Sequence, residues 1–325
     1  MLFGWLQVGV VLAAAGMFVG KVSGWLVSRR WLRSLDEVEP AKRFVLLSLF
    51  ALLPFVCALG AVVVAFTPSL LDSLGVVADH CAHHAGHAFH LCFLHGSPPD
   101  ISPVMVGVSA LVVAWPLFGL REELKRAYAT RKWARELDKL SRFDEDLGAR
   151  RLDSQRAVAL TVGLFRPMPF VSEKLCDVLS QRQLRAVLAH EQAHARRLDA
   201  LVKLIVRTAA RMHFESVREP LIERLDIACE QACDQSAAEA IGDRLTVAET
   251  ILAVERARGD EPSRPSALEF GGAPLQARVT AMVDDQWRAP LWWIGGAIIA
   301  GAAAGFGRYY DLLHHTVETM LAAIV

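Results

Sequence analysis

Two histidines and a glutamate have the spacing of the zinc ligands and the catalytic base of a hydrolase. They lie in the sequence His190-Glu191-Gln192-Ala193-His194, an HExxH pattern. On a helix the two imidazoles lie about 6 Å apart along the axis, so both project from one face and can bind one Zn²⁺. Glu191 lies beside that face, where it can take a proton from a water molecule that zinc has made more acidic. The pattern therefore predicts a catalytic zinc site.

The residues before this pattern predict the helix that it requires. Ser180 and Gln183 form a Ser-x-x-Gln sequence, which is typical of a capping box at the start of a helix. Leu184, Val187 and Leu188 then supply apolar side chains at helical spacing. We expect one helix to begin near Ser180 and to carry both histidines.

A catalytic zinc ion usually has three protein ligands, so a third ligand is expected elsewhere. The extended HExxHxxGxxH pattern is excluded, because Arg197 stands at its glycine position and Ala200 at its third histidine. A carboxylate on a later helix remains, and Glu230 is the best candidate. Asp234 lies one turn beyond Glu230 and can hydrogen-bond a ligand histidine. Glu230 can also be a solvated surface carboxylate, and three other carboxylates are rivals on the same helix: Glu223, Asp226 and Glu239.

Three segments together resemble a known family. They are GLFRP at 163–167, LRAVLAHEQAHARRLDAL at 184–201 and EQACD at 230–234. They resemble the BlaR/MecR antirepressor family of membrane gluzincins and, more distantly, the Ste24/HtpX metalloproteases. The resemblance covers roughly residues 100–285. It implies that His190, His194 and Glu230 bind zinc and that Glu191 is the catalytic base.

The chain departs from the Ste24/HtpX pattern around Pro274. A His-Pro-x-x-x-x-Arg element would place a histidine before Pro274, where this chain has Ala273. The group that stabilises the oxyanion is therefore unassigned, with Arg278 and His213 as candidates.

Composition indicates a membrane protein. The 325 residues are 53% hydrophobic, the mean hydropathy is +0.31 and the formal net charge is zero. These values exclude a generic nucleic-acid binder and a disordered chain. Four apolar stretches approach or exceed the length that crosses a bilayer: 2–27, 44–66, 103–120 and 290–306. The first is long and lacks a basic start, so we interpret it as a retained span and not as a signal peptide.

Loop charges predict the orientation through the positive-inside rule. Five basic residues lie between the first two stretches, and eight lie in 121–142, whereas 67–102 contains no Lys or Arg. The amino terminus and the 67–102 loop are then outside, and 121–289 is cytosolic. The expected location is the cytoplasmic membrane of a bacterium.

The expected fold is mainly α. Four transmembrane helices would carry an inserted α-rich cytosolic gluzincin domain with a small β-sheet: residues 1–120 form a membrane domain, 121–289 the metallopeptidase domain, and 290–325 a fourth span with a short tail. Residues 121–147 suit a juxtamembrane helix, and 158–164 and 169–172 have strand character. An exposed strand beside the HExxH helix would accept a substrate as an added strand, or the two strands form a lid without that role. Residues 257–274 are expected to form a loop.

The outside loop is rich in histidine. It holds six of the eleven histidines, and four of them would share one face of a helix, a spacing that can chelate a transition metal. A pH-sensing or purely structural turn is the alternative. Cys81 and Cys92 can form a disulfide there. The remaining cysteines, Cys57, Cys176, Cys229 and Cys233, are most simply small hydrophobic residues. The loop histidines are His80, His83, His84, His87, His90 and His95.

These features predict an integral membrane zinc endopeptidase. The resemblance implies a signalling protease that cleaves itself or a cytosolic transcriptional repressor. The protein is expected to be embedded in the lipid bilayer and to bind no nucleic acid directly. A quality-control protease and a non-proteolytic metal-sensing receptor are the alternatives. Because the chain ends about 19 residues after the fourth stretch, we expect no penicillin-binding sensor domain.

Overall fold

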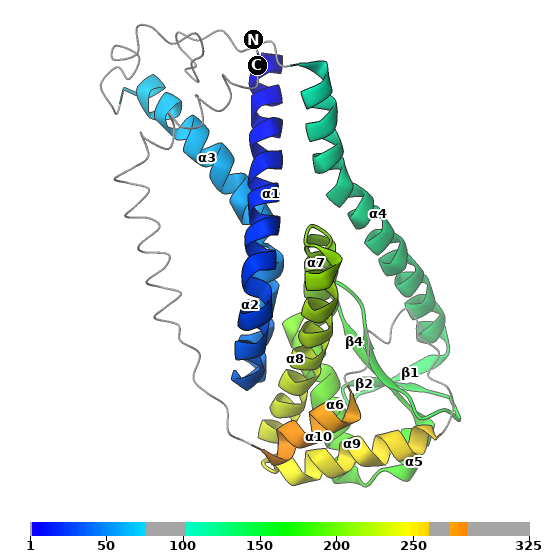
Figure 1. Ribbon diagram of the computed structural model, residues 1–325. Helices are drawn as coiled ribbons and strands as arrows, with labels where there is room; N and C mark the ends of the chain where they lie inside the picture. The colour runs from blue at the N-terminus through cyan, green and yellow to red at the C-terminus, as the bar shows by residue number, and fades with distance from the viewer. Residues whose placement is uncertain (1, 76–101, 260–273, 285–325) are drawn as a thin grey trace, which may run out of the picture. The chain divides into compact units, whose positions relative to one another are not determined.

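The structure is a computed structural model that describes residues 2–75, 102–259 and 274–284 (Figure 1). Its internal contacts divide the chain into two units. Among the described residues, the first comprises 2–27, 52–75 and 102–118, and the second comprises 28–51, 119–259 and 274–284. The histidine loop with Cys81 and Cys92, and the stretch 290–306, lie outside the described residues.

The first unit contains most of α1 (Leu2–Ser34), all of α3 (Leu53–Ser73) and the start of α4 (Pro103–Lys139). Its helices expose large apolar side chains, including Phe18 at 63% and Leu59 at 65%. Within the described part of the chain, the helix Trp5–Glu37 is long and apolar enough to cross a membrane. The bent pair Pro40–Ala51 and Leu53–Thr67 could make a second crossing. Four crossings therefore stay a prediction.

The stretch 44–66 is a bent pair of helices and not one straight helix, so the expected second span stays a prediction. It is divided between α2 (Pro40–Ala51) and α3, which are bent by 50° at the break. Pro54 explains the break, because proline has no backbone N–H and its ring clashes with the carbonyl four residues earlier. Helix α2 belongs to the second unit, where Phe44, Leu47 and Phe50 are buried and the helix packs on α7 and α8.

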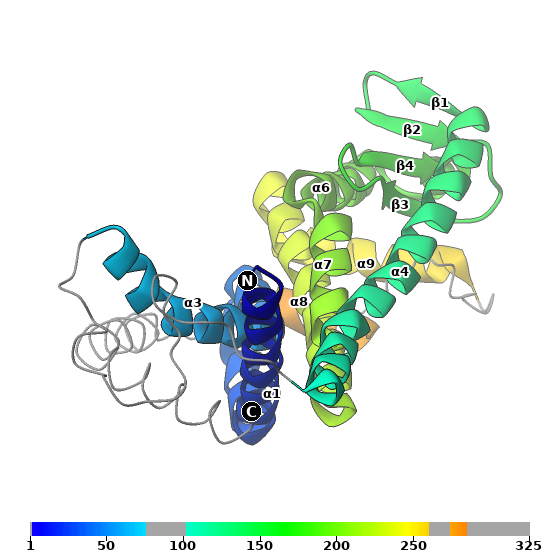
Figure 2. The same cartoon turned by 90° about the horizontal axis from the view of Figure 1, so that it is seen from above.

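The second unit contains a four-stranded sheet (Figure 2). Its strands are β1 (Ser141–Asp144), β2 (Ala149–Leu152), β3 (Ala159–Val162) and β4 (Met168–Ser172), in the order β1-β2-β4-β3. Strands β2 and β4 are parallel and the other pairs are antiparallel. The two predicted strands are confirmed as β3 and β4. The helix predicted over 121–147 ends at Lys139, and β1 follows it.

Further helices complete the unit, and some of them pack on the sheet. They are the 3₁₀ turn η1 (Leu35–Glu37), α5 (Glu173–Val178), α6 (Gln181–Arg197), α7 (Asp199–Ala210), α8 (Glu215–Ile241), α9 (Arg244–Arg258) and α10 (Leu275–Val283). Of the loop expected over 257–274, residues 260–273 lie outside the described chain, and α9 extends into its start.

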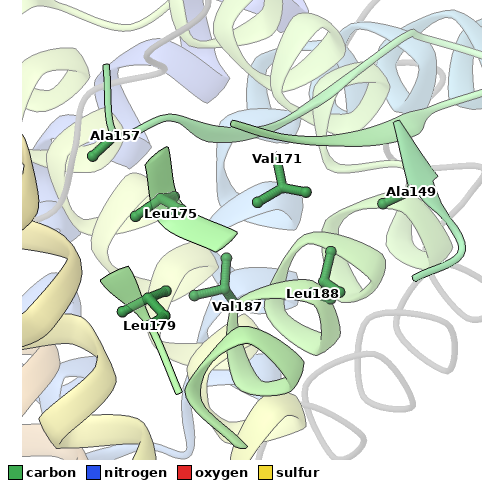
Figure 3. Packing of buried hydrophobic residues seen from close by; sticks show 7 residues of the cluster. All are labelled: Ala149, Ala157, Val171, Leu175, Leu179, Val187 and Leu188. Atoms are coloured by element: carbon green, nitrogen blue, oxygen red, sulfur yellow. The ribbon is translucent and has the colours of Figure 1, made fainter. Parts of the chain in front are cut away.

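A compact apolar cluster attaches α6 to the sheet (Figure 3). Val187 and Leu188 of α6 meet Val171 of β4 and Leu175 of α5. Burying such side chains stabilises the fold by about 1.5–3 kcal/mol each. The predicted capping box is present at the start of α6, where Ser180 accepts from the Gln183 backbone. This packing fixes the helix that carries the HExxH residues.

Candidate metal centre

Helices α6 and α8 bring three predicted ligand side chains together. His190 Nε2 lies 3.2 Å from His194 Nε2, and both lie near the Glu230 carboxylate. The distances are 3.6 Å from His190 Nε2 to Glu230 Oε2 and 3.7 Å from His194 Nε2 to Glu230 Oε1. The two helices pack closely along their length, which holds the three donors in place.

This arrangement fits a zinc ion. Ligands at 2.0–2.1 Å from a tetrahedral zinc are roughly 3.3 Å apart, close to the observed spacing. Each histidine also has a carboxylate at its other nitrogen: Asp234 Oδ1 lies 2.8 Å from His190 Nδ1, and Asp199 Oδ2 lies 2.7 Å from His194 Nδ1. A proton at each Nδ1 leaves the two Nε2 lone pairs facing one another, a repulsive arrangement that a cation relieves.

Asp199 is a site residue that the sequence reasoning did not identify. It follows Leu198, which has φ 53° and ψ 40°, the left-handed conformation that is uncommon for a residue with a side chain. This turn ends α6, starts α7 and brings the Asp199 carboxylate back to His194. The Nε atom of Arg197 lies 3.3 Å from Asp199 Oδ1. The periodic spacing of helical residues does not predict that the chain turns back in this way.

Positive side chains surround the Glu230 carboxylate. Lys203 of α7, only 2% exposed, places its Nζ 3.9 Å from Glu230 Oε1. An Arg278 nitrogen lies 3.7 Å from Glu230 Oε2. Burial would raise the pKa of the Glu230 carboxyl, but the charge of His194 and the hydrogen bond from His190 hold that pKa well below its usual range. Glu230 is therefore ionised at neutral pH, as a metal ligand must be.

The rival carboxylates on α8 lie outside this cluster. Asp226 pairs with Arg207 at 2.7 Å and with Lys203 at 3.4 Å. Glu223 and Glu239 are exposed. Of the carboxylates on α8, the described structure therefore groups Glu230 with the two histidines.

The two oxyanion candidates have other contacts. His213 is buried, and its Nε2 is placed to donate to the Phe50 carbonyl of α2 at 3.2 Å. Arg278 donates to both oxygens of Asp234, at 2.8 and 2.6 Å. The Arg278 guanidinium thereby fixes the carboxylate that faces His190. The structure leaves the oxyanion group unassigned.

Glu191 has a partner on the sheet. The Thr161 hydroxyl of β3 lies 2.7 Å from Glu191 Oε2 and 2.8 Å from the Glu191 backbone oxygen. A hydroxyl has one proton, so it donates to one of these oxygens at a time. The contact ties the expected catalytic base to an edge strand, and the sequence offered no signal for this pairing.

Comparison with known proteins agrees with this geometry. Residues 103–282 match the BlaR1 peptidase M56 family. The chain belongs to this family. The matched segment contains the HExxH helix and Glu230, and membership in the BlaR1 peptidase family indicates a metallopeptidase, for which zinc is the typical metal. No curated protein and no solved structure matches the chain.

In this member of the BlaR1 peptidase M56 family, Arg278→Ala is expected to lower the free energy of unfolding by about 3–5 kcal/mol, because it leaves the buried Asp234 carboxylate without its cation. Burial alone would raise the pKa of Asp234, but Arg278 holds it below its usual value, so the pair stabilises the fold at neutral pH. That contribution is lost as the pH falls through the lowered pKa of Asp234.

Urea unfolding in detergent measures the change. Arg258→Ala is the matched control, because Arg258 pairs with Glu255 on the exposed surface of α9. The control should cost less than about 1 kcal/mol. An equal loss of unfolding free energy in the two variants would show that the Arg278–Asp234 pair stabilises the fold no more than a surface ion pair does.

Proposed function

We propose that this protein is an integral membrane zinc-dependent endopeptidase that acts in signalling. The cluster of His190, His194 and Glu230, with Glu191 beside it, carries the proposal. These are two imidazole donors, one carboxylate and a separate base, the set that a catalytic zinc site in a peptidase uses. The family to which the chain belongs supports the same activity.

The chain's own residues suit peptide hydrolysis. His190, His194 and Glu230 would hold the zinc ion, which supplies Lewis acidity toward a water molecule and toward the peptide carbonyl. Glu191 would accept the proton of the attacking water and deliver it to the leaving amine. Thr161 positions the Glu191 carboxylate through its hydroxyl. Asp234 and Asp199 would hold the two imidazoles with Nε2 toward the metal.

Strand β3 supports the recognition of an extended peptide. It is the last strand of the sheet and pairs with β4 on one side. Its Thr161 contacts the Glu191 of α6, so this edge strand lies at the proposed catalytic base. An extended substrate that adds to such an edge gains backbone hydrogen bonds and brings a peptide bond near the metal. We therefore favour the substrate-binding interpretation of this strand over that of a lid.

Substitution of Thr161 tests the positioning of Glu191. Thr161→Val keeps the shape of the side chain but removes the hydroxyl, and the turnover number should fall roughly 10-fold, the effect of about 1.4 kcal/mol. Thr161→Ser keeps the hydroxyl and should retain most of the turnover. Zinc content should be the same in both. Equal turnover numbers for Thr161→Val and Thr161→Ser would contradict the positioning role of the hydroxyl.

Helix α2 supports a link between the membrane and the catalytic helix. Arg43 of α2 donates to the side chain of Gln231, the residue that follows Glu230. Gln231 in turn donates to the backbone oxygen of Ala277 at 2.7 Å, next to Arg278. Since α2 continues through the break at Leu52 into α3, a change in α3 has a direct route along the chain to the metal ligands. This connection favours a regulated protease.

The proposed topology places 67–102 outside and the HExxH residues in the cytosol, because the former segment has no basic residue and its neighbours have many. The measurement uses protein whose native cysteines are replaced by serine and a membrane-impermeant thiol reagent on intact cells. A cysteine introduced at Ser97 should be labelled. Labelling of a cysteine at Ser141, with none at Ser97, would reverse the orientation.

Comparison of new protein termini in cells tests the signalling role. Cells with the wild-type protein and cells with Glu191→Gln are compared by mass spectrometry. We expect cleavage of one or a few cytosolic regulators, or of the chain itself, only in the wild-type cells. Many unrelated membrane-protein fragments would instead favour quality control. No difference at all would contradict proteolysis and favour a receptor without enzymatic activity.

A further inference from the structure

Two cysteines lie directly behind the proposed zinc site and have no part in the proposed mechanism. Cys229 and Cys233 are four residues apart on α8, so their side chains share one face of the helix. Both thiols are free and fully buried. The sulfur of Cys233 lies 3.3 Å from His194 Nδ1 and 3.5 Å from Asp199 Oδ2.

The four side chains offer a second set of metal donors. Cys229 Sγ lies 4.0 Å from His194 Nδ1, which in turn lies 2.7 Å from Asp199 Oδ2. One donor atom each from His194, Asp199 and Cys229 falls within 4.8 Å of the other two. Ligands of a tetrahedral ion with bonds of about 2.0–2.3 Å lie roughly 3.3–3.8 Å apart, so small side-chain adjustments suffice. Of the three proposed catalytic zinc ligands, the set shares only His194 and uses its other nitrogen; it also includes Asp199, which contacts that nitrogen.

We propose that Cys229, Cys233, Asp199 and His194 Nδ1 form a second, inhibitory site for a thiophilic cation such as Zn²⁺ in excess, Cd²⁺ or Cu⁺. Paired thiolates with an imidazole and a carboxylate select soft cations over Mg²⁺ or Ca²⁺. The inhibition rests on the proposed peptidase function, whereas binding of the cation does not.

Two cationic side chains near the cysteines suit the negative charge that the second site would gain on binding a cation. Binding releases the protons of the two thiols and of His194 Nδ1 to solvent, which leaves two thiolates, a carboxylate and an imidazolate. Lys203 interacts electrostatically with Cys229, and Arg197 lies 3.3 Å from Asp199. These two buried or half-buried cations partly offset the negative charge that the site gains.

Occupancy of the second site would change His194 in two ways. The cation takes the Nδ1 position that Asp199 now contacts, so the carboxylate no longer holds the imidazole in its present tautomer. It also places a second positive charge on the same ring as the catalytic ion, which weakens that ion's binding by repulsion. Both effects lower peptidase activity without blocking substrate access.

Cadmium titration tests the site. The probe is Cd²⁺ added to purified full-length protein that carries one equivalent of zinc, and the readout is ultraviolet thiolate-to-cadmium charge transfer, with zinc content measured in parallel. One variant retains only Cys229 and Cys233, with serine at 57, 81, 92 and 176. Its matched partner retains those four cysteines and has serine at 229 and 233.

The first variant should show the charge-transfer band with saturation near one equivalent of Cd²⁺, and the matched partner should lack it at that concentration. Cys233→Ala alone should weaken cadmium binding at least 10-fold, which provides a second variant if the double substitution does not fold. A band that persists without Cys229 and Cys233, or no band when only they remain, overturns the proposal.

Peptide cleavage is measured as a separate readout. It should fall at least 10-fold as the band develops in the protein with Cys229 and Cys233, and should resist the same Cd²⁺ in the matched partner. Equal inhibition of both proteins overturns the inhibitory role. If neither protein cleaves peptides before cadmium is added, the proposed function fails, while the charge-transfer result still decides the site.

Discussion

Replacement of Glu191 by glutamine is expected to lower the turnover number roughly 10²–10⁴-fold, the usual contribution of a general base. Glutamine has nearly the same shape and keeps the contact with Thr161 possible, but it cannot accept the proton of the attacking water. The zinc content should remain one per chain, because Glu191 is not among the three clustered donors.

The measurement combines elemental analysis with cleavage of a denatured cytosolic protein mixture by the purified variant. Gln192→Ala is a control at the neighbouring position in the same helix, outside the proposed ligand set, and should retain most activity. If Glu191→Gln kept the wild-type turnover number, Glu191 would not be the catalytic base. Loss of zinc from the same variant would show that Glu191 is a ligand instead.

The second expected result concerns the ligands. His190→Ala, His194→Ala and Glu230→Ala should each lose bound zinc and all peptidase activity, because two remaining donors hold the ion too weakly. The expected loss of activity matches or exceeds that of Glu191→Gln. Metal analysis of the purified proteins, after dialysis against a weak chelator, measures it.

Glu239→Ala is the matched control for Glu230→Ala, since both residues lie on α8 and Glu239 is exposed. It should keep its zinc and its activity. Full zinc content in Glu230→Ala would show that another carboxylate is the third ligand. Circular dichroism of each variant distinguishes loss of the metal from loss of the fold.

The local features of the site were accessible from the sequence because they depend on residues close together in the chain. Ser180 and Gln183 start α6 as expected, and the four-residue spacing of His190 and His194 places them on one face. Asp234 could be expected at a histidine for a similar reason, because it lies one turn beyond Glu230 on the same helix.

The supporting residues could not be found in this way, because they come from distant or irregular backbone. Asp199 reaches His194 only because Leu198 adopts a left-handed conformation, which no periodic pattern predicts. Thr161 reaches Glu191 across thirty residues of chain, through the pairing of β3 with β4. Arg278 meets Asp234 from α10, after a long connection.

Two regions of the fold also differ from the expectation for physical reasons. The strands β1 and β2 contain the sequences SRFD and ARRL, whose charged side chains hide the alternation of a half-buried strand. The apolar stretch 44–66 has the composition of one span, but Pro54 divides it into a bent pair, and its first helix packs on α7 and α8.

The dependence of proteolysis on zinc stoichiometry tests the central claim most directly. Purified protein is stripped of metal with a chelator, and zinc is returned in steps while cleavage of the denatured protein mixture and bound metal are measured together. The account predicts no cleavage without metal and a proportional rise up to one zinc per chain, absent from Glu191→Gln at every step. Cleavage by the metal-free protein, or activity in Glu191→Gln equal to that of the wild type, would contradict it.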